Sequence, residues 1–272
     1  MVKLPDALII GPMRTGTTWV YEYLKARGDV CLPLGVKETF FFDQRFEKGL
    51  DWYSAHFRHF DPQKHRRIVE VAPSYFHNEE ATKRIKAVLG TPRLVVIIRD
   101  PIERSISHYR HLRRRGLVTE SFMQAANKFP EIIDASRYSK YLARWEAVFG
   151  KGAISLLWYD DLRNAPDKFV EALCKILSLP IYPTPTTLLH KKINPAGDPP
   201  SFRLARIGKR VGDWLRERRI YAPIEFAKAL GVKRLLFGTG EGAEKVKITS
   251  DERAFLQKQL ADDWQEFQKR FY

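Results

Sequence analysis

The stretch LIIGPMRTGTTW, residues 8–19, decides the fold class of this chain. An apolar run from Ala7 to Ile10 ends at Gly11, and a loop of small residues and threonines leads into a helical pattern from Thr17. A strand, a glycine-containing loop and a helix in this order aim backbone N–H groups and a helix N-terminus at an anion. The stretch therefore predicts a phosphate-binding loop at the end of the first core strand.

The loop departs from the nucleotide-triphosphatase motif G-x-x-x-x-G-K-[ST] at one position. Gly11 and Gly16 have the motif's spacing, but Thr17 stands where the motif has lysine. That lysine reaches the β- and γ-phosphates, and the basic side chain of this loop is Arg14 instead. The loop argues against ordinary ATP or GTP chemistry and favours a nucleotide with a less charged transferable group.

The composition limits the class of protein and of partner. The chain has 272 residues, with 47 Lys and Arg against 32 Asp and Glu, a net charge of +15. This length fits one α/β domain, and two small domains are the alternative. The charge indicates an anionic partner: a nucleotide, an acidic glycan, a nucleic acid or a membrane surface.

Cysteine usage and the first residues bear on the compartment. Two cysteines, Cys31 and Cys174, cannot build a disulfide framework or a zinc site, which favours a reducing compartment. The apolar run near the start is too short for a signal sequence or a membrane span and suits a core strand better. We expect a cytoplasmic protein.

The rest of the chain alternates short apolar runs with helical patterns. Strands are expected at residues 68–71, 94–98 and 154–158, and helices at residues 17–24, 49–57, 79–89, 138–149 and 166–177, with another starting at Asp100-Pro101. Six prolines predict an irregular loop over 180–200, and amphipathic patterns predict a basic helix over 201–219 and a terminal helix. This order predicts a single domain, 1–272, with a P-loop-type parallel sheet covered by helices on both faces. The basic segment 190–240 is expected to cover cofactor and substrate.

Three segments carry a resemblance to a known family. They are GPMRTGTTW at 11–19, KETFFFD at 37–43 and RDPIERSISHY at 99–109. Together they resemble sulfotransferases that use 3′-phosphoadenosine 5′-phosphosulfate (PAPS), above all the Golgi heparan sulfate sulfotransferases and their bacterial relatives. The first and third segments leave strand ends, where parallel α/β sheets bind their ligands.

The resemblance implies a role for particular residues. It assigns the 5′-phosphosulfate of PAPS to Arg14, Thr15, Gly16, Thr17, Thr18 and Trp19, the 3′-phosphate to Arg99 and Ser107, and a loop closing over that phosphate to Lys191 and Lys192. Glu38 matches the family's general base, and Arg14 would stabilise charge on the leaving group. No metal is implied, since a sulfuryl group carries less charge than a γ-phosphoryl group.

Two positions depart from the family pattern. Arg14 stands where the family loop commonly has lysine, which keeps the cation but changes its geometry. In EVAPSYF, residues 70–76, Val71 replaces the lysine of the family stretch E-K-x-x-x-Y-F. The second departure concerns a heparan-type acceptor more than sulfuryl transfer itself. A glycan, a lipid-linked sugar and a small hydroxylated metabolite stay open as acceptors, as does O- against N-sulfation.

Rival interpretations exist for the site residues. The loop could be a turn without a ligand, Glu38 could be a solvated carboxylate paired with Lys37, and Arg99 could pair with Asp100. Histidines at 56, 77 and 108 are rival bases, although each is more simply structural. Phe40, Phe41 and Phe42 are expected to form core and pocket wall.

Two other classes of function compete with sulfuryl transfer. A P-loop kinase of a small molecule would need the lysine that Thr17 replaces. A basic module binding a membrane or a polyanion would leave the three segments unexplained, and we expect no nucleic-acid partner. The basic helix at 201–219 is most simply a surface helix packed on the domain, with peripheral membrane-surface contact or acidic-substrate binding as its alternative roles.

Overall fold

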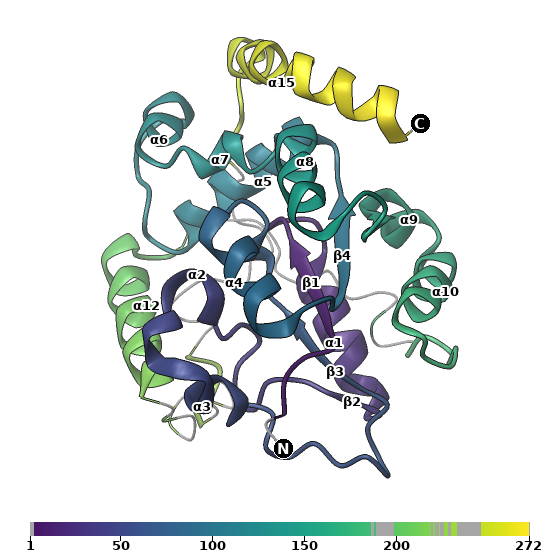
Figure 1. Ribbon diagram of the computed structural model, residues 1–272. Helices are drawn as coiled ribbons and strands as arrows, with labels where there is room; N and C mark the ends of the chain where they lie inside the picture. Colours follow the sequence, from purple (N-terminus) through teal and green to yellow (C-terminus); the bar gives the residue numbers. More distant parts are fainter. Residues whose placement is uncertain are drawn as a thin grey trace. The chain divides into compact units, whose positions relative to one another are not determined.

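A computed structural model describes residues 3–185, 199–218 and 246–271, with a few isolated positions between these ranges (Figure 1). The chain forms two compact units. The first comprises residues 1–100, 137–191 and 262–272, and the second comprises residues 101–136 and 192–261.

A five-stranded parallel sheet forms the centre of the first unit. Its strands are β1 (Ala7–Gly11), β2 (Val30–Cys31), β3 (Arg67–Val71), β4 (Arg93–Ile98) and β5 (Ile154–Trp158). They lie in the order β2-β3-β1-β4-β5, and every neighbouring pair is parallel. β1 is buried along its whole length, which matches the unbroken apolar run that a central parallel strand needs.

Helices of the first unit follow the strands along the chain. They are α1 (Thr17–Arg27), α2 (Phe41–Gln44), α3 (Gly49–Ser54), α4 (Glu79–Leu89), α8 (Tyr138–Phe149), α9 (Tyr159–Asn164) and α10 (Pro166–Leu177), with the 3-10 turns η1 (Phe46–Lys48) and η2 (Pro73–Tyr75). Local signals explain their starts. The side chain of Asn78 accepts a hydrogen bond from the Ala81 N–H at 2.8 Å and so caps α4. Pro166 opens α10, where its missing N–H costs nothing.

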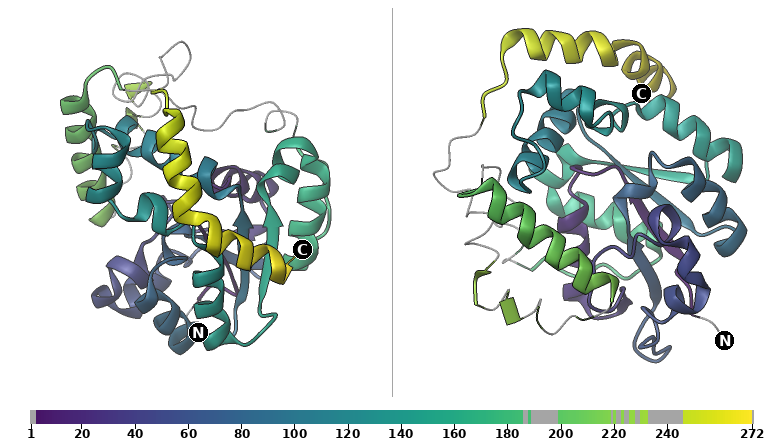
Figure 2. Two further views of the ribbon diagram at one scale, coloured as in Figure 1. Left: turned by 90° about the horizontal axis from the view of Figure 1, so that it is seen from above. Right: turned by 90° about the vertical axis from the view of Figure 1, so that its left-hand side faces the viewer.

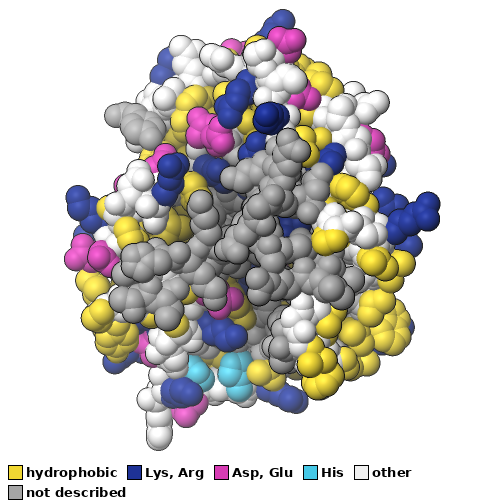
Figure 3. All heavy atoms as spheres, turned by 180° about the vertical axis from the view of Figure 1, so that it is seen from behind, with side chains coloured by type: hydrophobic (Ala, Val, Ile, Leu, Met, Phe, Trp, Pro, Cys, Tyr) yellow, Lys and Arg dark blue, Asp and Glu magenta, His cyan; other side chains and the backbone are white. Residues whose placement is uncertain are grey.

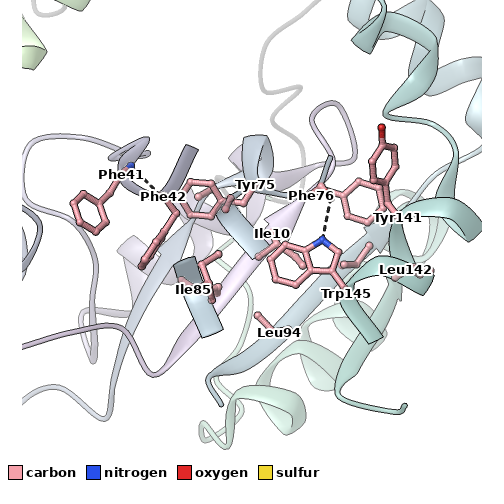
Figure 4. Packing of buried hydrophobic residues seen from close by; sticks show 14 of the residues in the cluster. Ile10, Phe41, Phe42, Tyr75, Phe76, Ile85, Leu94, Tyr141, Leu142 and Trp145 are labelled. Atoms are coloured by element: carbon pink, nitrogen blue, oxygen red, sulfur yellow. Dashed lines mark hydrogen bonds between the residues drawn. The ribbon is translucent and has the colours of Figure 1, made fainter. Parts of the chain in front are cut away.

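Both faces of the sheet are covered by helices, as the sequence predicts (Figure 2). On one face, Ile10 and Leu94 pack with side chains of α4 and α8, where the Trp145 indole N–H donates to the Phe76 carbonyl at 2.9 Å (Figure 4). The remaining strand surface contacts α1, beside β2 and β3, and α10, beside β4 and β5. The expected α/β fold class is therefore confirmed.

The second unit is helical in its described part. It contains α5 (Pro101–Arg114), α6 (Phe122–Lys128), α7 (Glu131–Asp134), α12 (Phe202–Glu217) and the first part of α15 (Ser250–Phe271). Its core joins α5, α6, α7 and α15 through side chains that include Ile106, Phe122 and Leu256. α12 approaches the end of α5 closely, because Arg206 Nε donates to the Gly116 carbonyl at 2.9 Å.

The apolar stripe of α12 does not serve as its packing face. Leu204, Ile207, Val211 and Trp214 are 55%, 57%, 52% and 49% exposed, whereas Ala205 is buried. Hydrophobic side chains also gather at the surface in the lower right of Figure 3. The sequence pattern predicted the helix correctly. The helix packs through the small residue Ala205, however, and its four large apolar side chains are exposed.

Candidate active site

The phosphate loop joins β1 to α1 in the first unit. Gly11 has φ +114°, and a Cβ at this position would lie 2.4 Å from the Pro73 carbonyl oxygen. Gly16, with φ +91°, is the N-cap residue of α1, and as a glycine it has no side chain with which to cap that helix. Inside the loop, the buried Thr15 hydroxyl donates to the Pro12 carbonyl at 2.7 Å. A glycine loop leading to an uncapped helix N-terminus fits an anionic phosphate or phosphosulfate.

Lys37 connects the KETFFFD segment with this loop. Its Nζ donates to Glu38 Oε1 at 2.8 Å and to Thr17 Oγ1 at 3.4 Å. The Lys37 and Glu38 side chains are 20% and 17% exposed, so the pair is largely shielded from solvent. The pairing of Glu38 with Lys37 therefore exists, but it is not a solvated surface pair. It places the Glu38 carboxylate beside the phosphate loop.

A buried carboxylate holds the residue that follows Glu38. Glu70, in β3, is completely buried, and its Oε1 accepts from the Thr39 N–H at 2.9 Å and the Thr39 hydroxyl at 2.6 Å. Its Oε2 accepts from the Tyr53 hydroxyl at 2.7 Å. Burial raises the pKa of Glu70 to about 7, although the hydrogen bonds from Thr39 and Tyr53 oppose this rise. Glu70 thus fixes the backbone that carries Glu38.

This role of Glu70 was not predicted from the sequence, where the residue stands out only as part of the family stretch EVAPSYF. The available signal was a lone carboxylate inside an apolar strand, RIVEV, since such a group stays buried only when hydrogen-bond donors surround it.

The aromatic run contributes Phe41 and Phe42 to the core, as expected. Phe41 and Phe42 are fully buried, and the Phe41 ring stacks on Tyr53 with centroids 4.4 Å apart. Phe40 has a left-handed φ of 56° and starts the turn into α2. Asp43 follows in α2, and burial raises the pKa of its carboxyl. The run is a packing element rather than a platform for stacked bases.

Arg99 lies at the loop as the sequence predicts. Its guanidinium donates to the Arg14 carbonyl at 2.9 Å and stands over the Tyr159 ring, 4.6 Å from the centroid. The Tyr138 hydroxyl donates to the Arg99 carbonyl at 2.8 Å. The end of β4 is therefore tied to the phosphate loop through a cation.

The remaining predicted site residues lie at the start of α1, on α5 and outside the described residues. Thr17 is buried and Thr18 is half-buried at the start of α1, while the buried Trp19 donates its indole N–H to the Leu188 carbonyl at 3.1 Å and stacks on Tyr23. Ser107 is half-buried on α5, which belongs to the second unit. Lys191 and Lys192 lie outside the described residues.

The rival bases have structural surroundings where the structure describes them. His56 is buried, with Nδ1 3.1 Å from the Trp52 carbonyl oxygen. His77 packs edge-on near the Tyr141 ring, and His108 is buried in α5 of the second unit. Glu38 is the candidate base that the described contacts place beside the phosphate loop.

Within the described ranges, no three His, Cys, Asp or Glu side chains come together as a metal site. None of the helices described there combines the length and apolarity that crossing a bilayer requires. Cys31 and Cys174 are buried free thiols, and burial raises the pKa of Cys31 to about 11.

Comparison with known families and proteins gives a consistent result. A family model described as a sulfotransferase domain matches residues 4–194. The bifunctional heparan sulfate N-deacetylase/N-sulfotransferase 1 of Xenopus laevis is 27% identical over 99% of this chain and 30% of its own length. The heparan sulfate glucosamine 3-O-sulfotransferase 3B1 of Mus musculus is 34% identical over 60% of this chain and 43% of its own length.

The chain thus spans less than half the length of these curated relatives. Among solved structures, a sulfotransferase from Alicyclobacillus acidocaldarius superposes with a TM-score of 0.60 at 20% identity, covering 82% of this chain and 97% of that one. This structural likeness supports the P-loop-type fold.

Proposed function

Because the chain belongs to the sulfotransferase family, we propose that it transfers a sulfuryl group from PAPS to a hydroxyl or amine of a carbohydrate. One observation carries the proposal: Lys37 joins the Glu38 carboxylate to Thr17 at the start of α1, with contacts of 2.8 and 3.4 Å. A proton acceptor beside an anion-binding loop is the pair of groups that sulfuryl transfer to an O–H or N–H requires.

The donor site is proposed from the loop residues. Backbone N–H groups of residues 14–18 and the N-terminus of α1 would bind the 5′-phosphosulfate, because the N-cap residue Gly16 has no side chain that would compete for them. Arg14 adds a permanent charge, and Arg99, tied to the Arg14 carbonyl at 2.9 Å, would bind the 3′-phosphate. The 3′-phosphate role of Ser107, on α5 of the second unit, stays a prediction of the family resemblance. Trp19, Lys191 and Lys192 stay predictions of the family resemblance. When bound, PAPS supplies the sulfuryl group.

Glu38 is proposed as the general base. It accepts the proton of the acceptor O–H or N–H as the new bond to sulfur forms. The bond between sulfur and the bridging phosphate oxygen breaks, and its electron pair leaves with the nucleotide. Arg14 stabilises that departing charge. The acceptor gains one sulfo group and loses one proton, so the step balances.

The carbohydrate acceptor is inferred from the relatives. The names of the two relatives given above describe both as sulfotransferases of heparan sulfate, and one name specifies its glucosamine. A net charge of +15 suits an acidic glycan. Val71, in place of the family lysine, indicates an acceptor that differs from heparan sulfate in its contacts near the end of β3.

We also propose a cytoplasmic enzyme that touches anionic membrane surfaces. Two buried free thiols suit a reducing compartment. On α12, the exposed apolar stripe is bordered by the exposed Arg203 and Arg210, and a basic helix with an apolar face suits the headgroup region of an anionic bilayer.

The decisive experiment incubates the chain with PAPS and a panel of oligosaccharides and measures mass. We expect a gain of one sulfo group, and we expect Glu38→Gln to lower turnover by roughly 10²–10⁴-fold while binding of the desulfated nucleotide is retained. Glu47→Gln, at an exposed position of η1, is the matched control. Near-normal turnover of Glu38→Gln would show that the base lies elsewhere.

A further inference from the structure

Lys37 places an ammonium group where the loop motif would have one. Thr17 occupies the position that is lysine in nucleotide-triphosphatase loops, and Lys37 Nζ lies 3.4 Å from the Thr17 hydroxyl oxygen. The lysine comes from the segment after β2, not from the loop. The cation missing from the loop sequence is thus present in space, delivered from twenty residues further along the chain.

The surroundings of Lys37 favour an anion. Thr17 is 4% exposed and is the first residue of α1, whose N-terminus carries a partial positive charge. The Arg99 guanidinium donates to the backbone carbonyl of Arg14 at 2.9 Å, so a further cation lies at the same loop, which itself contains Arg14. Of the side chains of Lys37, Thr17, Arg14, Arg99 and Glu38, only that of Glu38 is anionic. A second anion at the helix N-terminus would relieve the repulsion between the cations.

We propose that Lys37 is a catalytic residue that donates hydrogen bonds to the anionic oxygens of the sulfuryl donor. This inference rests on the proposed function. As the bond between sulfur and the bridging oxygen breaks, the electron pair stays on the nucleotide phosphate, and the Lys37 ammonium stabilises that charge without giving up its proton. The acceptor proton passes to Glu38, so Lys37 and Glu38 act at opposite ends of the same transfer.

The pairing of Lys37 with Glu38 couples donor binding to the base. Before the donor binds, the ammonium occupies Glu38 Oε1 at 2.8 Å. When Lys37 turns its N–H groups to the donor, that oxygen becomes available to the proton of the acceptor. The same side chain therefore keeps the base engaged until the donor is in place.

Calorimetric titration with the desulfated product, adenosine 3′,5′-bisphosphate, tests this role without turnover. Lys37→Met should weaken binding by roughly 10- to 100-fold, the effect of one hydrogen bond to a charged group. Lys37→Arg should recover part of the affinity because it keeps the charge but changes the geometry. Lys48→Met, which removes an exposed lysine of η1, is the matched control and should bind as the wild type does.

Each outcome separates the two proposals. Wild-type affinity in Lys37→Met, with an unchanged circular-dichroism melting curve, would overturn the role of Lys37 and leave the proposed function intact. A wild-type chain that binds the nucleotide no better than AMP would overturn the proposed function itself. Lys37→Gln serves as a second variant and carries the same expectation, so a folding defect in one variant does not decide the result.

Discussion

Glu70 shows how one buried residue can hold the segment that carries the proposed base. The carboxylate receives two hydrogen bonds from Thr39 and one from Tyr53, at 2.6–2.9 Å, inside the core. These donors come from two separate segments after β2. Loss of any one of them leaves a buried group unsatisfied, at a cost of about 1–3 kcal/mol.

The raised pKa of Glu70 predicts a pH-dependent stability. The folded chain has a pKa of about 7 at this site, above the ordinary value of 4.5, so the folded state holds the proton more tightly. The stabilisation is complete below about pH 4.5 and is lost as the pH rises through about 7, in total about 3 kcal/mol at 1.4 kcal/mol per unit.

Glu70→Gln has no proton to lose at this position. We therefore expect the free energy of unfolding of wild type, measured with urea, to fall relative to that of Glu70→Gln between pH 4.5 and pH 7.5. Glu171→Gln, at an exposed position of α10, removes one carboxylate without this environment and should follow wild type. Parallel pH profiles for Glu70→Gln and wild type would contradict the assignment.

Arg99 is expected to distinguish nucleotides by their 3′-phosphate. Arg99→Ala should weaken binding of adenosine 3′,5′-bisphosphate about 10- to 100-fold more than binding of AMP, because a charge-assisted arginine–phosphate contact is lost with the first ligand alone. Both ligands also share any loosening of the Arg14 carbonyl, so the difference between them isolates the contact. Arg163→Ala, at an exposed position of α9, is the control, and equal losses for both ligands would refute the role.

At the scale of single residues, short-range patterns were readable and long-range partners were not. In the sequence, Lys37 and Glu38 belong to one short motif and the phosphate loop to another. Arg99 was predicted at a strand end. It could not show that Lys37 reaches Thr17 or that Glu70 holds Thr39, since each contact joins residues twenty or more positions apart.

At the scale of elements, strong periodicity gave reliable bounds. α4, α8, α10 and β5 begin and end at the expected residues, because each has an apolar face with a clear start or stop signal. The two-residue β2 and the four-residue α2 were missed, since neither is long enough to show a period. α12 was predicted, but its packing face was not. That face is set by the close approach of Gly116 to the Phe202 backbone.

The exposed stripe of α12 predicts binding to anionic vesicles. The chain should co-sediment with vesicles of phosphatidylcholine and phosphatidylglycerol, and less with phosphatidylcholine alone, because apolar burial and basic charge act together. Ile207→Ser combined with Trp214→Ser should abolish the binding. Ile181→Ser, which removes a 59% exposed isoleucine outside α12, is the control. Undiminished binding of the double variant would exclude α12 as the contact.

At the scale of the whole molecule, the charge of +15 indicated an anionic partner, and the alternation of strands and helices predicted the parallel sheet. No composition shift or linker in the sequence marks the division of the chain into two units. Because the chain passes through each unit more than once, no single position in the sequence separates the two units.

The charge arrangement also predicts a reaction that proceeds in the presence of a chelator. Arg14 and Lys37 provide positive charge at the phosphate loop, and a sulfuryl group carries less negative charge than a γ-phosphoryl group. Initial rates of sulfo-group transfer should therefore be the same with excess EDTA as without it. Rates that collapse with EDTA and return with Mg²⁺ would revive the P-loop kinase alternative.

The close packing around Gly11 limits the substitutions that position 11 can accept. In a saturation library selected for activity, position 11 should return glycine alone, because the first carbon of any side chain would meet the Pro73 backbone at 2.4 Å. Gly28 has φ +75° with nothing within 4 Å of an added carbon, so asparagine and aspartate should survive there. Position 11, at the end of β1, should therefore not vary, whereas position 28, after the end of α1, should accept other residues.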